Sequence, residues 1–517
     1  MNLYDYILDS NIRQSGFVNA TLIIYRIMNF ISFESYINDI NNVSVDDTTI
    51  LDYSRYFTHN PQEVLNHKSN FTSSIIPSIN DIIINNPSLD PNMSLLELLN
   101  SIMVILPFED IQLVYPESMI LESIQSSNPQ LTSLIIQIVL EKSNERDMIE
   151  FLEDSEFLVY ATRTYFTESD DIQNLKVSST YENLLAYIAT VSPHLVDKLS
   201  NPELVSLYKK IRDDPEGNST LFSRLLDFII IIFPVSHEWI PTSLYKFSKI
   251  EFSIDDPLLV ILLISFYKKF IQQINITSVI LTTIKPSLYD IMELFTRRQQ
   301  DSLIESFYAV EIVVLLYHWS HSDNKLLLGY LGELTDSFKI FKSYNLYLDE
   351  LASDIELLAS FNPDQINDKL DFLEDIIQLP LLQQRYFPIF LNILSSKDLF
   401  GKLVELNKLN IKSISKLSLD MIFKLLFTIS NYKYSTHWLL SDAPQLMSDY
   451  VIASSAAISE SEIWSLKKSI LENLLNKNSS QELGVWKETI ESTYSLMKNG
   501  RNVKDIIPRV EVATDTG

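Results

Sequence analysis

The sequence STLFSRLLDFIIIIFPVSHEWIPTSLYKFSKIEFSIDDPLLVILLISFYKKFIQQI, from Ser219 to Ile274, is the most apolar part of this chain. It predicts two buried helices joined by a shorter one. Polar side chains of the first helix fall at helical spacing on one narrow stripe, made of Thr220, Ser223, Arg224 and Asp227. Pro234 is expected to end this helix, because proline has no N–H with which to continue the hydrogen-bond ladder.

The last helix of this stretch has a clear start. Asp256 is a plausible N-cap, and Pro257 suits the first helical position. The run from Leu258 to Ile264 is then apolar on every face, so neighbours should cover it on several sides. Such short unbroken runs are far from the ~20 apolar residues that cross a bilayer. We therefore expect this stretch to form the centre of a helical stack.

Glycine is scarce in this chain, with 8 among 517 residues, well below the usual ~7%. Tight hairpins and phosphate-binding loops depend on glycine, so a β-rich or nucleotide-binding fold is disfavoured. The 19 prolines fall mostly as single breaks between apolar segments, as in helices joined by short turns. The composition predicts an all-α protein whose hydrophobic content of 46% can fill a large core.

The formal net charge of −27 limits the range of partners. Such a surface repels nucleic-acid phosphates and anionic lipid heads, so we expect a basic protein surface as partner, with no direct nucleic-acid or membrane binding. The absence of cysteine rules out disulfides, thiolate nucleophiles and cysteine-based zinc sites. The start, MNLYDYILDSNIRQ, lacks the basic region of a signal peptide. The expected location is the cytoplasm, with the nucleus as an additional compartment.

Turn residues and apolar periodicity divide the chain into three parts. Residues 1–90 are expected to form an N-terminal helical cap with irregular linkers, including a helix at 20–33 and a polar, irregular segment at 41–60. The segment INNPSLDPNMS, residues 84–94, is the best linker. Residues 91–500 are expected to form a helical repeat array. Residues 501–517 lack helical periodicity and are expected to be disordered.

Helix pairs recur along the second half of the chain. Their expected starts are residues 218, 256, 299, 345, 379, 416 and 460, a spacing close to the ~40–47 residues of armadillo and HEAT repeats. No repeated sequence signature accompanies this spacing. The prediction is therefore a curved α-solenoid of divergent HEAT/armadillo-like repeats, and the alternative is a large irregular helical domain.

No sequence motif for catalysis or cofactor binding is present. The chain lacks GxxxxGK[ST], GxGxxG, GxSxG and HExxH, so we assign no catalytic or cofactor-binding residue and expect a non-enzyme without cofactors. His318 and His321 lie one helical turn apart. They lack an acidic residue at ligand spacing, so helix capping or solvent contact is preferred over a metal site.

Two charged clusters and three tyrosines have both a structural and a functional interpretation. An acidic helix face and a lysine-rich segment could be solvated surfaces or contacts for a partner; they contain Asp368, Asp371 and Asp375, and Lys402, Lys408, Lys412 and Lys416. The lysine segment lacks interleaved aromatic residues and arginines, which weakens a nucleic-acid interpretation. The tyrosines flank the central apolar helices and could pack in the core or anchor an interface: Tyr245, Tyr267 and Tyr289.

Several segments resemble the fungal family of proteasome-base assembly chaperones, which also carries the label DNA mismatch repair protein. The central segments are RLLDFIIIIFP (224–234) and DDPLLVILLISFYKKFIQQI (255–274). The C-terminal segments are NYKYSTHWLLSDAPQLMSDYVI (431–452) and SILENLLNKNSSQELGVWKETIESTYSLMKNGRN (469–502). The likeness covers about residues 215–275 and 420–502. These are packing patterns, and the order and spacing of their residues make them specific.

The resemblance implies a curved stack of HEAT-like repeats and a role in assembly of the 26S proteasome. Members of that family bind the C-terminal domain of one AAA-ATPase subunit in the base of the 19S regulatory particle. They escort it together with a neighbouring ATPase and a large non-ATPase subunit, and they hinder premature docking on the 20S core. An acidic, glycine-poor solenoid agrees with such a protein-binding scaffold.

We expect the partner on a concave face lined by the second helices of the central repeats. Charged groups there would steer and orient the partner, and a tyrosine would supply contact area. The candidate partner-binding residues are Asp255, Asp256, Tyr267, Lys268, Asp290, Glu293 and Arg297.

Two other functions fit the same fold. One is a different α-solenoid adaptor, such as a transport receptor or a trafficking scaffold. The other is a DNA mismatch repair factor, as the second family label suggests. The charge of −27 argues against direct duplex binding, because nonspecific affinity for DNA comes from phosphate neutralisation. An indirect effect on repair, through the supply of proteasomes, is physically easier.

Overall fold

The computed structural model describes residues 30–40, 45–85, 90, 92, 94–125, 129–167, 172–215, 217–249, 251–253, 256–341, 351–369, 379–453 and 460–499. Within these ranges the regular elements are helices, and none of the described residues is in a strand. The predicted all-α repeat fold is thereby confirmed. The tail from 501, most of the linker at 84–94 and the first part of the helix expected at 20–33 lie outside the described residues.

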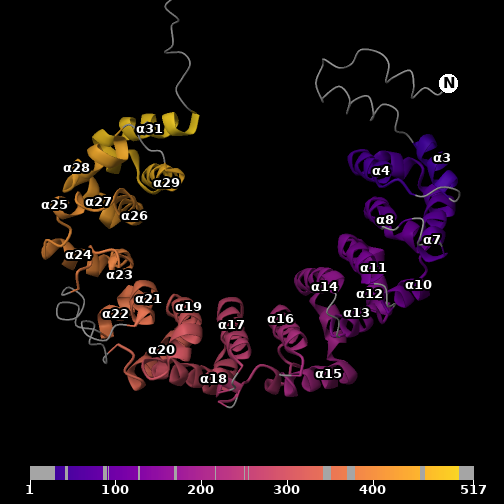
Figure 1. Cartoon of the computed structure of the whole chain (residues 1–517), viewed down its shortest axis with the longest axis horizontal. Coiled ribbons are helices and arrows are strands. Elements are labelled where there is room, and N and C mark those ends of the chain that lie inside the picture. Colours follow the sequence, from indigo (N-terminus) through magenta and orange to yellow (C-terminus); the bar gives the residue numbers. More distant parts are fainter. Residues whose placement is uncertain are drawn as a thin grey trace, which may run out of the picture. The chain divides into compact units, whose positions relative to one another are not determined.

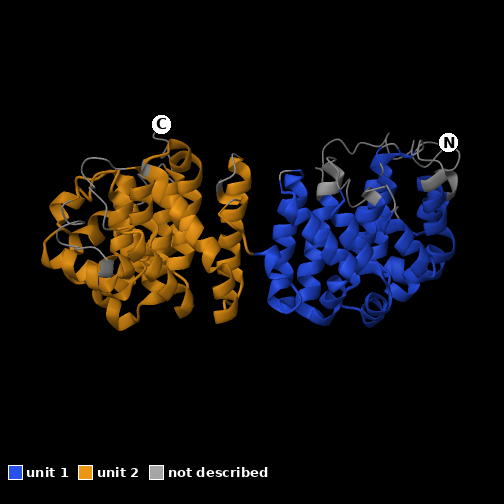
Figure 2. Cartoon of the chain, turned by 90° about the horizontal axis from the view of Figure 1, so that it is seen from below, with its two compact units in different colours: residues 1–245 blue, residues 246–517 orange. Residues whose placement is uncertain are grey.

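The chain divides into two compact units, residues 1–245 and 246–517 (Figure 2). The division falls inside the apolar stretch that was expected to be one continuous centre. A boundary near residue 90 between cap and repeat array stays a prediction. Helix α4, from the expected cap, packs against α8 within the first unit.

The first unit is built from short helices connected by turns. Its described elements are α3 (Phe30–Ile40), α4 (Asp47–His59), α5 (Pro61–Asn66), α6 (Lys68–Asn70), η1 (Phe71–Ile75), α7 (Ile76–Asn85), α8 (Ser94–Ile105), α9 (Phe108–Gln112), α10 (Glu117–Ile124), α11 (Pro129–Lys142), α12 (Arg146–Asp154), α13 (Phe157–Tyr165), α14 (Ile172–Val191), η3 (Pro193–Ser200), α15 (Pro202–Asp213), α16 (Ser219–Ser236) and η4 (Thr242–Leu244).

The second unit continues in the same manner. Its described elements are η5 (Glu251–Ser253), α17 (Pro257–Gln273), α18 (Ser278–Thr296), η6 (Arg297–Gln299), η7 (Ile304–Tyr308), α19 (Ala309–Ser320), α20 (Lys325–Ser337), α21 (Ala352–Ser360), α22 (Pro363–Lys369), α23 (Phe387–Ile393), α24 (Lys397–Glu405), α25 (Ile411–Ile414), α26 (Leu419–Ser430), α27 (Lys433–Ser441), α28 (Pro444–Leu446), η9 (Met447–Ile452), α29 (Ser461–Lys477), α30 (Ser480–Leu483), η11 (Gly484–Trp486) and α31 (Lys487–Asn499).

The helices of each unit stack in two rows, as in a solenoid (Figure 1). In the first unit α4, α8, α11, α14 and α16 pack in succession, beside a second row that contains α10, α13 and α15. In the second unit the first-helix row is α17, α19, α21, α23, α26 and α29. The second-helix row is α18, α20, α22, α24 and α27. Each expected repeat start from 218 onward therefore precedes a helix of the first row.

Three local expectations were wrong. The segment 41–60 contains α4, which begins because Asp46 caps it and accepts a bond from the Thr48 N–H. Helix α16 continues past Pro234 to Ser236, since a proline so close to the helix end removes little of the hydrogen-bond ladder. Prolines were expected mostly to separate helices, yet Pro286 lies inside α18.

Helix α16 is the most deeply packed part of the apolar stretch. Among the described residues it is the one helix long and apolar enough to span a membrane, with a mean hydropathy of 1.6. However, 61% of that window is buried inside the protein, as in the core helices of many folds. Its Arg224 is buried too, and donates to the backbone oxygen of Tyr165 at 2.9 Å. The polar stripe of α16 therefore contributes to packing between helices.

Helix ends in both units receive hydrogen bonds from the following repeat. The last carbonyl groups of a helix have no partner inside the helix and need one elsewhere. In the connection between α17 and α18, the oxygen of Ile276 likewise accepts from Asn324 Nδ2, at 2.8 Å. At the end of α21, Asn392 Nδ2 donates to the oxygens of Leu358 and Phe361, at 2.9 and 2.8 Å. Each bond spans about one repeat in sequence.

The same arrangement recurs along the array with other donors. Lys142 Nζ donates to the oxygen of Val104 at the end of α8, at 2.7 Å. Tyr434 donates through its hydroxyl to the oxygen of Leu394 after α23, at 2.9 Å. We call these bonds the cross-repeat caps. They align successive repeats because each donor reaches its acceptor only when the two layers are in register.

We predict that Asn392→Ala lowers the stability of the second unit by about 1–3 kcal/mol, because two carbonyl oxygens lose their partner. Asn476→Ala is a matched control, since Asn476 is exposed on α29. The midpoint of urea denaturation, followed by circular dichroism, measures both variants. Equal midpoints for the two variants would contradict a role of Asn392 in capping.

A buried lysine makes the stability of the second unit depend on pH. Lys467 on α29 is 1% exposed, and its Nζ donates to the oxygen of Ala453 at 2.5 Å. Burial lowers the pKa of Lys467 to about 8, from an ordinary 10.5. Between these two values the unfolded chain binds more protons than the folded chain, so the stability contribution of Lys467 increases as the pH rises.

We predict that Lys467→Met stabilises the protein at pH 7, by about 1–3 kcal/mol, because the cost of burying a charged amine disappears. The advantage over wild type should shrink as the pH rises from 8 to 10.5. Thermal denaturation across this pH range tests the prediction, with Lys468→Met as the control on the same helix. An advantage that does not change with pH would contradict it.

Candidate functional site

The helical segment from Leu303 through η7 and α19 exposes a stripe of apolar side chains. The helix is covered by α17, α20 and α21, which leaves one side uncovered. We name the residues of that side the α19 stripe: Leu303, Phe307, Val310, Val314 and Tyr317. They follow one another at alternating intervals of four and three residues, so they share one helix face.

The exposure of this stripe is unusual for side chains of this type. Leu303 is 42% exposed, Phe307 52%, Val310 44% and Tyr317 41%. Single exposed apolar residues are common on protein surfaces, but a contiguous row marks an interaction site more often than not. Within the second unit this helix row lies on the concave side (Figure 1).

A π-helical turn occupies the beginning of the stripe. Residues 304–308 form η7, in which the amide of Ala309 bonds to the oxygen of Ile304. A π-turn inserts one extra residue into a helix, and such turns are frequent at functional sites. Here the turn contains Phe307 and lies directly after Leu303. The π-turn therefore contains Phe307, the more exposed of the two aromatic residues in the stripe.

The neighbouring helix α17 extends this apolar surface. Leu258 is 70% exposed, and Ile261 and Leu262 are half-buried. The expectation that neighbours cover the run from Leu258 to Ile264 on several sides is thus wrong at its beginning. The outward side of α17, from Leu258 to Gln272, and the α19 stripe together form one surface, which we call the α17–α19 face.

Toward its C-terminal end the α17–α19 face carries polar groups beside the apolar stripe. Lys268 Nζ lies 3.7 Å from Glu311 Oε2, and both side chains are half-buried. Gln272 Nε2 lies 2.9 Å from His318 Nδ1. Burial lowers the pKa of His318, and the positive charge of Lys268 lowers it further. The imidazole is therefore neutral at physiological pH, so it adds no charge beside the Lys268–Glu311 pair.

The structure separates the seven predicted partner-binding residues. Asp256 caps α17, and its Oδ1 accepts from the Leu258 N–H at 2.9 Å, as predicted. Lys268 lies on the α17–α19 face. Tyr267 does not: its side chain is fully buried, and its hydroxyl accepts from the Phe247 N–H at 3.3 Å. The expectation that Tyr267 contacts a partner is wrong. Asp255 lies outside the described residues.

The other three predicted residues lie on the second-helix row, in or directly after α18. Glu293 Oε1 lies 2.6 Å from Lys249 Nζ. Burial raises the pKa of Asp290, and the negative charge of Glu293 raises it further. Arg297 is exposed at the end of α18. These residues do not join the α17–α19 face, because the two rows present opposite sides of the stack.

Sequence reasoning missed the α19 stripe. Helix α19 is apolar almost all round, so periodicity alone does not reveal which face the neighbours leave open. One sequence signal could have indicated an exposed apolar face: residues 303–317 contain more apolar residues than one buried side of a helix can hold. It was expected that the second helices line the concave face; Figure 1 shows the first-helix row there, within the second unit.

The remaining candidates have structural roles or stay untested. His321 Nδ1 lies 2.9 Å from the oxygen of Tyr317, and the described residues contain no group of three or more His, Asp or Glu that could hold a metal ion. Tyr245 is buried, whereas Tyr289 is 44% exposed. Of the acidic cluster, Asp371 and Asp375 lie outside the described residues.

The fold and this surface define a class, an α-helical repeat protein with an open apolar face. The family described as DNA mismatch repair protein HSM3 matches in two parts, its N-terminal domain over residues 37–272 and its C-terminal domain over residues 277–517. The chain belongs to this family.

Curated relatives cover most of the chain. The protein named DNA mismatch repair protein HSM3 from Debaryomyces hansenii is 36% identical over 454 residues, which are 86% of this chain and 87% of that one. The protein of the same name from Scheffersomyces stipitis is 32% identical, over 86% of this chain and 89% of that protein. The protein of that name from Saccharomyces cerevisiae is 22% identical, over 79% of this chain and 82% of that protein. An engineered protein aligns with 84% of this chain at a TM-score of only 0.31 and 11% identity.

The family boundary and the division into compact units differ. The two family domains meet between residues 272 and 277, after α17. The two compact units, in contrast, are divided after residue 245, so α17 belongs to the second unit. Helix α17 pairs with α19 in that unit. The α17–α19 face therefore combines residues from both family domains in one compact unit.

We predict opposite stability effects for two aromatic residues of this region. Tyr267→Ala should lower stability by about 3–5 kcal/mol, because it leaves a cavity in the core. Phe307→Ser should change it by no more than ~0.5 kcal/mol, because Phe307 is a surface residue in the free protein. Urea denaturation of the two variants beside wild type measures both effects. A large loss for Phe307→Ser would assign that side chain to the core.

Proposed function

We propose that this chain is a non-catalytic chaperone for assembly of the regulatory-particle base of the 26S proteasome. It binds the C-terminal domain of an AAA-ATPase subunit and acts in the cytoplasm, with the nucleus as an additional compartment. It escorts that subunit with a neighbouring ATPase and a large non-ATPase base subunit, and blocks premature docking on the 20S core. The sequence resemblance supplies the identity of the partner.

The observation that carries the proposal is the α17–α19 face. Its exposed leucines, valine and phenylalanine lie on a helix row that is open to a partner. Removing these apolar side chains from water when a partner binds is favourable, roughly in proportion to the apolar area that is buried. The polar end of the face, with the Lys268–Glu311 pair and Gln272, then fixes the orientation, because polar groups of the partner can pair there in only one direction.

Release needs no catalysis in this proposal. A chaperone that covers an apolar surface of its client leaves when a later subunit competes for that surface. Because each contact is reversible, the outcome of the competition depends on the affinities and the concentrations of the competing subunits. This agrees with a family membership that carries no sign of a reaction centre.

We predict that the double substitution Phe307→Asp and Val310→Asp weakens binding of the ATPase C-terminal domain at least about 100-fold, because two carboxylates would be buried in an apolar contact. The full-length protein is titrated with the purified C-terminal domain of each base ATPase by calorimetry. The matched control is Val279→Asp and Leu326→Asp, two exposed apolar residues of α18 and α20. Equal losses for both pairs, or none for the first, would contradict the placement of the site.

The identity of the partner is tested separately, by affinity purification of the tagged protein from its native host. Base ATPases and a large non-ATPase subunit without 20S core would support the proposal. Intact proteasomes would contradict an assembly role. Recovery of cargo carrying a basic import signal, or of a small GTPase, would favour a transport or trafficking adaptor.

The name of the relatives favours a second candidate, a role in DNA mismatch repair. The net charge of −27 disfavours direct duplex binding, so such a role would act indirectly, through proteasome supply. An electrophoretic shift of duplex DNA by the purified protein, weakening steeply with salt, would support direct binding instead.

A further inference from the structure

An acidic residue of the π-turn reaches across to the next repeat. Glu305 lies in η7, two residues before Phe307. Its Oε1 accepts from the Ser353 N–H at 3.0 Å, and its Oε2 accepts from the Ser353 hydroxyl at 2.6 Å. Both oxygens of one carboxylate therefore bind one residue in the first turn of α21.

These two bonds cap α21 from outside the helix. The first amides of a helix need acceptors, and the residue before α21, Leu351, provides none through its side chain. A carboxylate is a favourable acceptor there, because the positive end of the helix dipole attracts negative charge. Ser353 is 1% exposed, so water has little access to replace Glu305 as its partner. The contact therefore joins the π-turn firmly to α21.

A buried ion pair links the same part of the chain to α21. Arg298, in η6, donates through Nη2 to Asp354 Oδ1 at 2.5 Å, and the two side chains are 4% and 3% exposed. Nη1 of Arg298 donates to the oxygen of Phe295 near the end of α18, at 2.9 Å. Asp354 follows Ser353 in α21, so the segment from η6 into η7 binds two successive residues of this helix. The beginning of the π-turn is therefore held in one position.

The core fixes the other end of the π-turn. Helix α19 buries Ile312, Leu316 and Trp319, whose side chains are 0% exposed. A π-turn contains one residue more than an α-turn, so it fits a length of chain between two fixed ends that a regular helix would not fit. Phe307 lies within this turn. The direction of its side chain therefore depends on the anchors at both ends.

We propose that Glu305 is a positioning residue for the α17–α19 face, because its bonds to Ser353 hold the π-turn in the conformation in which Phe307 projects toward a partner. This inference rests on the proposed function, since it concerns the same binding surface. The carboxylate of Glu305 is occupied by Ser353, so it acts on the partner through Phe307. When these bonds are lost, η7 relaxes toward a regular helix, and the Phe307 side chain changes its direction relative to the rest of the α19 stripe.

The free, full-length protein tests the positioning directly. The chain has no cysteine, so Phe307→Cys creates a single attachment point for a nitroxide spin label, and Tyr317→Cys creates one at the other end of the same stripe. We expect Glu305→Ala to narrow the electron paramagnetic resonance spectrum of the label at position 307 and to leave the spectrum at position 317 unchanged. An unchanged spectrum at 307, or equal changes at both positions, would overturn the proposal.

Binding of the purified ATPase C-terminal domain tests the consequence for a partner. Glu305→Ala should weaken this binding about fivefold or more. In the background of Phe307→Ala the same substitution should weaken it by less than about twofold, because residues that act through one another have non-additive effects. Equal losses in the two backgrounds would mean that Glu305 does not act through Phe307, and would overturn the proposal.

Two variants separate positioning from a general loss of stability. Glu305→Gln keeps an acceptor for the Ser353 N–H and should bind within about twofold of wild type. Ser396→Ala removes the N-cap of α24, in the second-helix row, where the Ser396 hydroxyl accepts from the Leu399 N–H at 3.4 Å. It should lower the midpoint of urea denaturation, as the loss of a cap does, yet leave the Kd and both spectra unchanged. A loss of binding for either variant equal to that of Glu305→Ala would overturn the assignment.

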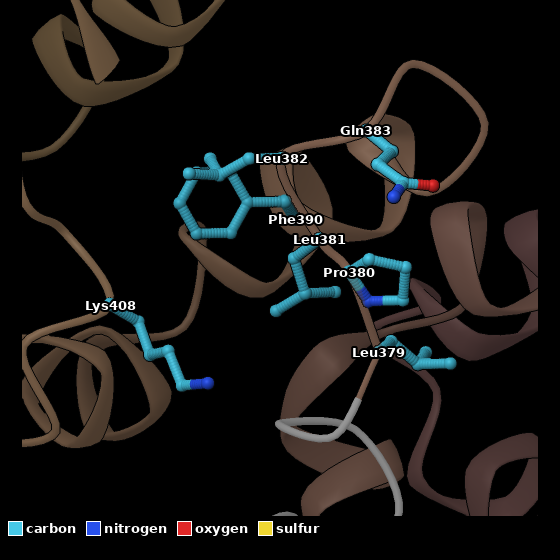
Figure 3. Close-up of a pocket in the computed structure, with 7 residues that line it drawn as sticks. All are labelled: Leu379, Pro380, Leu381, Leu382, Gln383, Phe390 and Lys408. Atoms are coloured by element: carbon cyan, nitrogen blue, oxygen red, sulfur yellow. The ribbon is translucent and has the colours of Figure 1, made fainter. Parts of the chain in front are cut away.

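A separate apolar surface of the second unit supplies a further control. A pocket of about 310 Å³ precedes α23, and its lining includes Leu381, Leu382 and Phe390 (Figure 3). It shares no residue with the α17–α19 face or with the contact between η7 and α21. Leu382→Ser removes apolar surface there and should leave the Kd for the ATPase domain within about twofold, because independent sites do not couple. A loss as large as that of Phe307→Ala would contradict a binding site centred on the π-turn.

The positioning role and the proposed function can fail independently. If no base ATPase domain binds the wild-type protein, the proposed function fails, and the spin-label spectra still decide whether Glu305 positions Phe307. If the domain binds wild type and Glu305→Ala equally well, the proposed function stands and the positioning role is excluded.

Discussion

The two-row stack depends on hydrogen bonds between one repeat and the end of a helix in the preceding one. Each helix leaves carbonyl oxygens without an internal partner, and burying them unpaired would cost free energy at every layer. Side chains such as Lys142 in the first unit and Asn392 in the second supply the missing donors. Because a donor must meet its acceptor, these bonds also fix how far one layer is displaced along the next. Apolar packing alone is less directional and would not set this register.

A stack aligned in this way can expose apolar side chains without losing its shape. Leu258 and Phe307 contribute little to the core of the free protein, and the neighbouring helices remain aligned by packing and capping. The same rigidity keeps the apolar stripe and the polar end of the α17–α19 face at a fixed spacing. A partner therefore meets a preformed surface, and little conformational entropy is lost in ordering it. This property suits a protein that holds a client and then releases it.

The family name and the physical properties of the chain direct attention to different functions. The relatives are named for DNA mismatch repair, yet the acidic charge and the open apolar face are properties of a surface that binds proteins.

The helical class, the repeat spacing, the cap at Asp256 and the family could all be predicted from the amino-acid sequence, because they depend on local propensity, turn residues and the order of packing motifs. The outward-facing residues of the most apolar helices could not. Tyr267 and Leu258 lie on the same helix, yet the first is fully buried and the second is 70% exposed. In a helix that is apolar all round, periodicity gives no preferred face. The position of the site follows only from the packed fold, because neighbouring helices determine which side stays open.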